Sequence, residues 1–296
     1  MNLGELIASS ANALRAADVH FGHGTTNAYD EAAWLVLWQL DLPLDTPLDD
    51  EGGAAAQAIA SEALHRVQPL GQKRITSRGP SAYLTGEAWL QGVAFHVDER
   101  CIVPRSLIAE LLAQGALDYW LPEDARRLLD LCTGGASLAI LAAMAYPDLK
   151  IDAADISSDA LAVAQLNIQR HGLQDQIRLL QGDGLAVSQG PYDMIICNPP
   201  YVNSDSMSQL PPEYRAEPSL ALAGGKDGMD FVRRLLQDAH AVMSEAAVLV
   251  LEIGHERPYF EAAFPTLGVV WLDTSAGQDQ VCVVTRDALI PHSPGG

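Results

Sequence analysis

A short segment of this chain combines polar and aromatic side chains with an unusually stiff backbone. Residues Asn198, Pro199, Pro200 and Tyr201 directly follow the apolar run Met194–Cys197, which has the composition of a buried strand. Two consecutive prolines remove two backbone donors and hold φ near about −65°, so neither a helix nor a sheet can continue through them. In open α/β sheets, ligands bind at the carboxyl ends of strands. These four residues, the Asn198–Tyr201 bracket, are therefore the first candidate for a ligand-binding site.

Three earlier strand-like runs also end in residues that suit a ligand, and together they suit a nucleoside. Gly134 and Gly135 follow the first run, and a glycine turn between a strand and a helix lets a ligand approach the backbone. The second run ends at Asp155, 21 residues after Gly134, where a carboxylate can accept hydrogen bonds from ribose hydroxyls. The third run is followed by Asp183, which can accept from an adenine amino group.

Each of these strand ends also has an ordinary structural explanation. A glycine turn occurs in any α/β protein, Asp155 can cap the helix expected to open near Ser157, and Asp183 can be a solvated turn residue. The dinucleotide fingerprint G-x-G-x-x-G is absent, which disfavours a dehydrogenase. Four such strand ends in succession are much more specific than any one of them, and they predict a ligand site at one edge of a sheet.

The composition narrows the class of protein. The chain has 296 residues and 48% hydrophobic content, enough to fill a sizeable core. Its net charge of −20 argues against an extended grip on a nucleic-acid backbone and favours a basic protein or a small ligand as partner. No signal-peptide pattern or membrane-span-length apolar run is present, which predicts a cytoplasmic protein. The cysteines and histidines lack the paired spacing of metal ligands, so no metal site is predicted.

The pattern of apolar residues predicts a division into parts. Residues 1–70 have helical periodicity, with Asn27 as an expected N-cap, and form a small helical domain. Residues 71–105 are expected to be a polar linker, 71–80, followed by a hairpin. Residues 106–290 alternate strands and helices, which predicts a parallel sheet covered on both faces, and residues 291–296 are expected to be a disordered tail.

Seven strands and two long helices are predicted in the larger part. The strands are Arg127–Leu131, Lys150–Asp155, Ile177–Gln181, Tyr192–Cys197, Ala246–Glu252, Gly268–Leu272 and Gln280–Thr285, and the helices are Ser158–His171 and Asp227–Met243.

With these motifs in place, the chain resembles a known family, the class I S-adenosylmethionine-dependent methyltransferases, and among them the glutamine methyltransferases of the HemK type. The motifs that carry the resemblance are Asn198–Tyr201, Asp130–Gly134, Ala154–Ser157 and Gly224–Gly228. Two further segments, Tyr83–Trp89 and Val97–Ser106, are similar to the branch that modifies large-subunit ribosomal protein three. The release-factor-modifying branch usually has Pro-Arg-Pro where this chain has Pro104-Arg105-Ser106.

The resemblance implies a fold, a cofactor and a set of site residues. The fold is a seven-stranded Rossmann-like sheet with a small N-terminal helical domain that recognises a protein substrate, and the cofactor is S-adenosylmethionine. The residues implied in cofactor binding are Asp130, Thr133, Gly134, Gly135, Asp155, Asp183 and Asn198. Those implied in substrate binding are Asn198, Pro199, Pro200, Tyr201 and Arg105, and the catalytic ones are Asn198, Pro199 and Tyr201.

The same resemblance gives the bracket a chemical role. A carboxamide nitrogen is a poor nucleophile, because its lone pair is delocalised into the carbonyl. As methyl leaves the sulfonium, positive charge develops on this nitrogen, so acceptors aimed at its N–H bonds stabilise the transition state. The Asn198 side-chain oxygen and the Pro199 carbonyl are implied as these acceptors, and Tyr201 offers a flat face on which a planar amide can stack.

One departure from the family pattern concerns the glycine turn. The family usually has Gly-x-Gly after Thr133, whereas this chain has Gly134-Gly135-Ala136. If residue 136 needs a positive φ or a close approach of the ligand, the added methyl group disfavours that conformation by at most about 1 kcal/mol, provided the turn can relax. The departure concerns the strength of cofactor binding and leaves the predicted fold unchanged.

Three other functions stay open at this point. A release-factor glutamine methyltransferase shares the same motifs, and an adenine amino-methyltransferase uses the same bracket on another conjugated nitrogen. The latter must hold nucleic acid and extrude a base, which the net charge of −20 disfavours. A non-catalytic adapter of the same fold is motivated only by Ala136.

Overall fold

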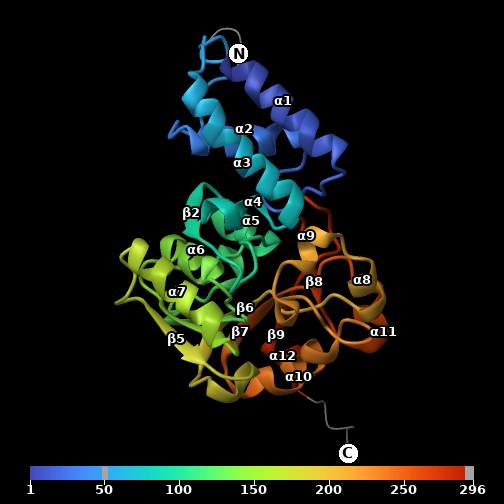
Figure 1. Ribbon diagram of the computed structural model, residues 1–296. Coiled ribbons are helices and arrows are strands. Elements are labelled where there is room, and N and C mark those ends of the chain that lie inside the picture. The colour runs from blue at the N-terminus through green and yellow to red at the C-terminus, as the bar shows by residue number, and fades with distance from the viewer. Residues whose placement is uncertain (49–52, 291–296) are drawn as a thin grey trace, which may run out of the picture.

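The computed structural model describes residues 1–48 and 53–290, so the predicted tail 291–296 lies outside the described residues. The N-terminal part contains α1 (Leu3–Ala16), α2 (Ala28–Gln39) and α3 (Ser61–Ser77). Asn27 caps α2 as predicted, because its side chain accepts from the backbone N–H groups of Tyr29 and Asp30. The three helices enclose a core of their own. Figure 1 shows this helical part stacked on one end of the sheet-containing part.

The predicted linker at 71–80 is wrong for most of its length, because α3 continues to Ser77. Residues 71–80 include charged side chains that form ion pairs with other parts of the molecule. Arg74 is buried and ion-paired with Glu31 and Glu213. Arg78 then ends the helix in a left-handed conformation, with φ of 56°. In the sequence, the charged residues that pair α3 with its neighbours look the same as the exposed polar residues of a linker.

The predicted hairpin is confirmed. After the short helix α4 (Ser81–Thr85), strands β1 (Glu87–Leu90) and β2 (Val93–His96) pair antiparallel. Gln91 and Gly92 connect them with φ of 50° and 75°, and two successive positive φ values suit the right-handed twist of a tight hairpin. The hairpin packs against α7 (Ser158–Arg170) through Asn167, which bonds the backbone of His96.

All seven predicted strands form one sheet. They are β3 (Arg127–Leu131), β4 (Lys150–Asp155), β5 (Ile177–Gln181), β6 (Tyr192–Cys197), β7 (Met243–Glu252), β8 (Val270–Trp271) and β9 (Val281–Thr285). The order is β5-β4-β3-β6-β7-β9-β8. The expectation of a fully parallel sheet is wrong at one edge, because β9 runs antiparallel to both β7 and β8. A short turn around Thr274–Gly277 joins β8 to β9. Parallel neighbours need a longer crossover, usually a helix, and none lies between these two strands.

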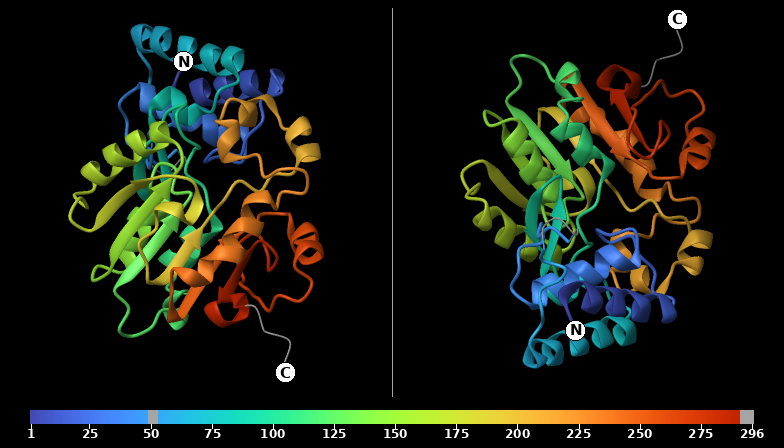
Figure 2. Two further views of the ribbon diagram at one scale, coloured as in Figure 1. Left: turned by 90° about the horizontal axis from the view of Figure 1, so that it is seen from below. Right: turned by 90° about the horizontal axis from the view of Figure 1, so that it is seen from above.

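Helices cover both faces of the sheet, as the alternating pattern predicts. The remaining helices are α5 (Leu107–Ala113), α6 (Ser137–Ala145), α8 (Ser204–Gln209), α9 (Pro212–Arg215), α10 (Asp230–Asp238), α11 (Arg257–Ala263) and α12 (Arg286–Leu289). One core lies under α5, α6 and α7 and a second under α10, α11 and α12. Figure 2 shows these two groups on opposite sides of the strands. The predicted helix 227–243 is longer than the observed one, because α10 covers only Asp230–Asp238, a 3-10 turn follows at Ala239–Ala241, and β7 begins at Met243.

Candidate active site

The four strand ends singled out in the sequence lie side by side at one edge of the sheet. Leu131 of β3 pairs with Ala154 of β4 and with Cys197 of β6, while Asp155 pairs with Gln181 of β5. The chain proceeds outward from β3 to β5 and then returns to β6 on the other side of β3, so the strand order reverses there. Such a switch point is where open α/β sheets bind ligands.

The turn between β3 and α6 is built from left-handed backbone conformations. Cys132, Gly134 and Ala136 have φ of 61°, 55° and 63°. Ala136 is the residue that departs from the family pattern, and it is fully buried at the N-cap of α6. Its left-handed conformation is one that glycine adopts at lower cost than alanine. The position therefore does require a positive φ.

Asp130 anchors this turn from within the sheet. Its Oδ2 accepts hydrogen bonds from the Thr133 hydroxyl at 2.5 Å and from the Ala139 backbone N–H at 2.9 Å. Its Oδ1 is buried and has no hydrogen-bond partner among the described residues. Burial raises the pKa of the Asp130 carboxyl to about 7, and the neighbouring Asp155 adds to the rise. A cationic or hydrogen-bonding group placed near Oδ1 would stabilise the ionised form.

Asp155 ties the second strand end to the first. Its Oδ2 accepts from the Gly134 backbone N–H at 2.8 Å, and its Oδ1 accepts from the Ser157 N–H at 2.9 Å. Burial raises the pKa of the Asp155 carboxyl, although these backbone bonds oppose the rise. Ser157, and not Asp155, is the N-cap of α7, since its hydroxyl accepts from Ala160. The Asp155 carboxylate therefore joins the first two strand ends and is not the cap of α7.

Asp183 differs from the other two carboxylates. It is exposed at the end of β5, and its Oδ2 accepts from Arg234 of α10 at 2.9 Å. Gly182, the residue before it, donates to the Asp155 carbonyl and so holds this strand end against β4. The structure thus places Asp183 at the predicted edge but gives it a partner that the sequence did not indicate.

The bracket begins with an amide side chain in a defined orientation. The Asn198 Nδ2 donates to the Arg105 carbonyl oxygen at 3.3 Å. No hydrogen bond among the described residues uses its Oδ1. Pro199 is buried, whereas Asn198 and Pro200 are partly exposed. An acceptor oxygen is therefore available at the end of β6.

The last residue of the bracket, Tyr201, is held by close backbone packing. A Cβ on Gly228 would lie 2.2 Å from the Tyr201 carbonyl oxygen, and one on Gly254 would lie 2.6 Å from the Tyr201 ring. Any side chain at these two positions would displace the tyrosine. Burial raises the pKa of the Tyr201 hydroxyl, and the nearby Glu252 carboxylate raises it further. The motif Gly224–Gly228 therefore serves to fix Tyr201.

Arg105 is joined to a residue that the sequence did not single out. Its Nη1 and Nη2 donate to the two carboxylate oxygens of Glu217 at 2.7 and 2.6 Å, and its guanidinium lies 5.3 Å from the centre of the Tyr214 ring. Glu217 also accepts from the Val103 N–H at 2.9 Å. Contacts with His23 and Arg105 lower the pKa of Glu217 to about 2, although burial opposes this. An acidic residue after a short helix carries no periodic signal, so only the fold reveals this pairing.

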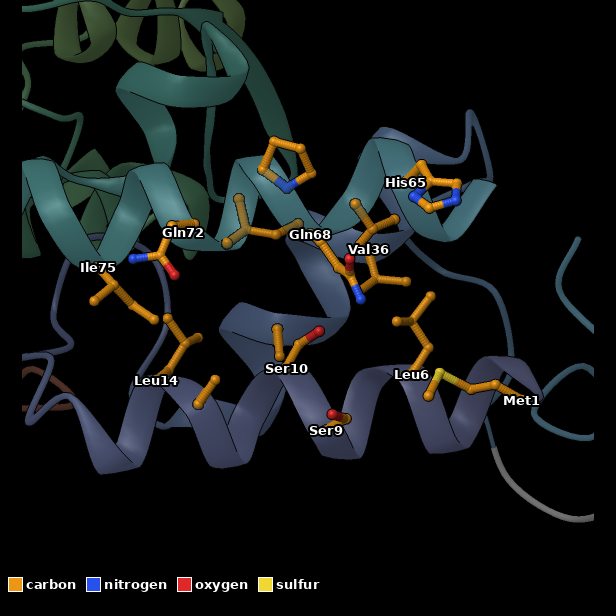
Figure 3. A pocket seen from close by; sticks show the side chains of 16 residues that line it. Met1, Leu6, Ser9, Ser10, Leu14, Val36, His65, Gln68, Gln72 and Ile75 are labelled. Carbon is orange, nitrogen blue, oxygen red and sulfur yellow. The ribbon is translucent and has the colours of Figure 1, made fainter. Parts of the chain in front are cut away.

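Two cavities in the described part of the chain lie in or beside the helical domain. One of about 550 Å³ lies between α1, α2 and α3, where Leu14 of α1 points toward Ile75 of α3 (Figure 3). Another of about 840 Å³ lies between the end of α2 and β1, lined by Trp38 and Trp89. The predicted site residues line neither cavity, so the helical domain has concave surfaces distinct from the strand-end site.

The described residues contain neither a metal-ligand cluster nor a helix of membrane-spanning character. Across 1–48 and 53–290, no group of three or more His, Cys, Asp or Glu side chains is arranged to hold a metal ion. Within the same ranges, no helix is both long and apolar enough to cross a membrane.

Known proteins resemble this chain over nearly its whole length. A family model described as the methyltransferase small domain matches residues 110–210. The ribosomal protein uL3 glutamine methyltransferase of Bordetella pertussis is 54% identical over 292 residues, 97% of this chain and 96% of that one. This chain belongs to the ribosomal protein uL3 glutamine methyltransferase family. Relatives of the same name from Burkholderia pseudomallei and Neisseria meningitidis serogroup A are 47% and 45% identical, covering 96% and 93% of this chain and 94% and 89% of theirs.

Solved structures confirm the fold of this uL3 glutamine methyltransferase family member. The hMettl16 catalytic domain in complex with MAT2A 3′UTR hairpin 1 superposes with a TM-score of 0.53 at 14% identity, over 86% of this chain and 89% of that one. The complex with hairpin 6 gives a TM-score of 0.52 at 13% identity, over 76% and 81%. These likenesses show the fold alone. The predicted family, the class I methyltransferase fold and the assignment as a methyltransferase are confirmed, and the family implies S-adenosylmethionine as methyl donor.

Proposed function

We propose that this enzyme transfers a methyl group from S-adenosylmethionine to the side-chain amide nitrogen of a glutamine in large-subunit ribosomal protein three, uL3. The observation that carries the proposal is the orientation of Asn198, whose Nδ2 is bound to the Arg105 carbonyl so that its Oδ1 is left to accept. An acceptor at this place suits an incoming N–H group. The 54% identity to a relative named for this activity supports the choice of substrate.

The substrate amide would be activated by charge stabilisation. As the nitrogen attacks the methyl carbon, positive charge develops on it and its N–H groups become stronger donors. The Asn198 Oδ1 and the Pro199 carbonyl would accept these bonds and favour the transition state over the ground state. The Tyr201 ring would stack on the planar carboxamide and align it, and Pro200 would keep the bracket rigid. The methylated amide can lose its proton late, so no strong base is required.

The residues at the neighbouring strand ends fit the proposed cofactor. S-adenosylmethionine supplies an electrophilic methyl group on a sulfonium, and its amino group is cationic. The unpaired Oδ1 of Asp130 suits such a cation, with Thr133 holding the other oxygen of this carboxylate. Gly134 and Gly135 leave the turn without side chains at the edge of the site, and Asp155 offers carboxylate oxygens to ribose hydroxyls.

Two of the proposed site residues need a more specific role. Asp183 already accepts from Arg234 through Oδ2, so we propose that Oδ1 receives the adenine amino group. Arg105 uses both terminal nitrogens on Glu217, so we propose that it serves the substrate through its backbone carbonyl, which holds Asn198.

The alternative functions have less support. A release-factor substrate disagrees with the substrate for which the relatives are named. An adenine substrate would require a protein of net charge −20 to bind nucleic acid. A non-catalytic adapter would leave the fixed bracket without a purpose. A ribosomal protein as substrate also favours the cytoplasm as the place of action.

The experiment that tests the proposal is mass spectrometry of ribosomal proteins and release factors from cells with and without the gene. We expect a glutamine of uL3 to carry one added methyl group only when the gene is present. Purified enzyme should transfer labelled methyl to free uL3, and Asn198→Ala should lose on the order of 10²-fold in turnover while still binding the cofactor. Methylated release factors with unmodified uL3, or methyladenine in nucleic acid, would contradict the proposal.

A further inference from the structure

The segment that follows the bracket carries a buried carboxylate, Glu217, that contacts three residues outside the segment. The Glu217 side chain is 0% exposed. It receives both terminal nitrogens of Arg105 at 2.7 and 2.6 Å and the Val103 N–H at 2.9 Å, and the His23 Nε2 lies 3.3 Å from it. A bidentate guanidinium–carboxylate pair fixes orientation as well as distance. Glu217 therefore fixes the guanidinium of Arg105 and the backbone of Val103, two residues before it.

The immobilised backbone is the one that orients the proposed catalytic amide. The Arg105 carbonyl accepts from the Asn198 Nδ2 at 3.3 Å, and no other hydrogen bond among the described residues holds this amide. An Asn side chain presents an oxygen on one side and an NH₂ group on the other, so the carbonyl decides which of them faces the substrate. If the Arg105 backbone moved, Asn198 could turn its donor toward the substrate N–H groups.

We propose that Glu217 is a positioning residue for methyl transfer, which orients Asn198 through Arg105 and so keeps the acceptor oxygen turned toward the substrate amide. This inference rests on the proposed role of Asn198. The contacts of Glu217 are with Arg105, Val103 and His23, so it would act on the reaction through Arg105. Its effect is exerted on the rate of the chemical step, while the strand ends that bind the cofactor lie outside its contacts.

The same carboxylate joins the helical domain to the site. His23 belongs to the segment between α1 and α2, and its ring packs 4.3 Å from the centre of the Tyr214 ring, on the segment that carries Glu217. The helical domain therefore contributes one of the groups that surround Glu217. Displacement of this domain would disturb the carboxylate that holds Arg105.

The test compares two buried glutamates of one segment. Glu217→Gln keeps the shape of the side chain but loses the charge that pairs with Arg105. We expect its kcat to fall on the order of tenfold or more, since a misplacement of about 1 Å at a reacting group costs about a hundredfold. Its KM for S-adenosylmethionine should stay within about twofold of the wild type, because its contacts do not include the cofactor residues.

The matched control is Glu213→Gln. Glu213 is also 0% exposed and lies four residues away, but its partners are Arg74 and Arg78 and not Arg105. We expect this variant to lose stability and to keep its kcat at temperatures where it is folded. Equal losses of kcat in both variants would show that any disturbance of the segment slows the enzyme, and would overturn the proposal.

A double-mutant cycle with Asn198→Ala gives the decisive readout, with radiolabelled methyl transfer to uL3 as the assay. If Glu217 acts through Asn198, Glu217→Gln should have little further effect once the amide is gone. If instead the two substitutions lower the rate by independent factors that multiply in the double variant, the proposal is overturned. If Glu217→Gln does not fold, Arg105→Lys, which keeps the charge but not the bidentate geometry, takes its place in the same cycle with the same two outcomes. Absence of methyl transfer by the wild type would instead contradict the proposed function.

Discussion

At the scale of single residues, Asp130 is the most deeply buried carboxylate of the proposed cofactor site. Its pKa is raised by burial from 3.8 to about 7 in the folded protein. The group therefore stabilises the fold at pH values below the unfolded pKa, and this contribution is lost as the pH rises through about 7. In the ligand-free enzyme, ionisation of Asp130 near neutral pH destabilises the fold, and a cationic ligand beside the carboxylate would offset this.

This linkage predicts the behaviour of Asp130→Asn. The asparagine keeps an acceptor for Thr133 and Ala139 but does not ionise. Between about pH 4 and about pH 7, the free energy of unfolding of the variant should rise relative to the wild type by a few kcal/mol. Denaturant unfolding of the ligand-free proteins at several pH values measures this. A difference that does not change with pH would mean that Asp130 titrates at its ordinary pKa.

Ala136 gives a second prediction at a single position. Its φ of 63° is easy for glycine and costly for alanine, so Ala136→Gly should raise the free energy of unfolding by up to about 1 kcal/mol. Ala13→Gly is the matched control, because Ala13 is exposed in the interior of α1 and should lose about 1 kcal/mol on the same change. Urea unfolding measures both variants. A lower free energy of unfolding in Ala136→Gly would contradict the inference that alanine is strained at this φ.

At the scale of elements, α3 is fastened to the rest of the molecule by buried charges. Arg74 is 1% exposed and lies between Glu31 of α2 and Glu213 of α9. Its Nη2 also donates to the His20 carbonyl at 3.0 Å. Removing one member of such a cluster leaves the other charges buried without compensation. The helical domain and the segment after the bracket are thus joined by ion pairs as well as by the ring contacts of Tyr214 with His20 and His23.

Arg74→Met should therefore lower the free energy of unfolding by about 3–5 kcal/mol. Arg66→Met, on the same helix, is the control, because Arg66 is half exposed and lies 3.9 Å from the exposed Asp41. An exposed pair of this kind contributes at most about 1 kcal/mol. Thermal or denaturant unfolding distinguishes them, and similar losses in the two variants would argue against a special role for Arg74.

The strands and their ends could be predicted from the sequence because local signals determine them. Apolar runs such as Tyr192–Cys197 match the observed strands to the residue, and the bracket ends its strand through covalent constraints of proline. The extent of α3 and the pairing of Arg105 with Glu217 could not be predicted in this way. Both depend on charged side chains whose partners lie 43 to 139 residues away, and a buried charge looks like an exposed one until its partner is known.

At the scale of the whole molecule, the net charge of −20 should act on the encounter with a basic protein. Long-range attraction raises association rates and is screened by salt. The value of kcat/KM for uL3 should therefore fall as ionic strength rises, while the affinity for S-adenosylmethionine, measured by calorimetry in the same buffers, should change much less. A rate for uL3 that does not depend on salt would show that the acidic surface plays no part in the encounter.

The buried ion pairs between the helical domain and the segment after the bracket also bear on how one glutamine is chosen. Arg74 and Arg78 both pair with Glu213, so ion pairs join the helical domain to the segment that follows the bracket and limit how far the two can move relative to each other. A substrate docked on that domain would present to the bracket only the residue at a fixed separation from the docked part. The enzyme would then select its target by the distance between the docked part and the glutamine, rather than by the residues that flank the glutamine.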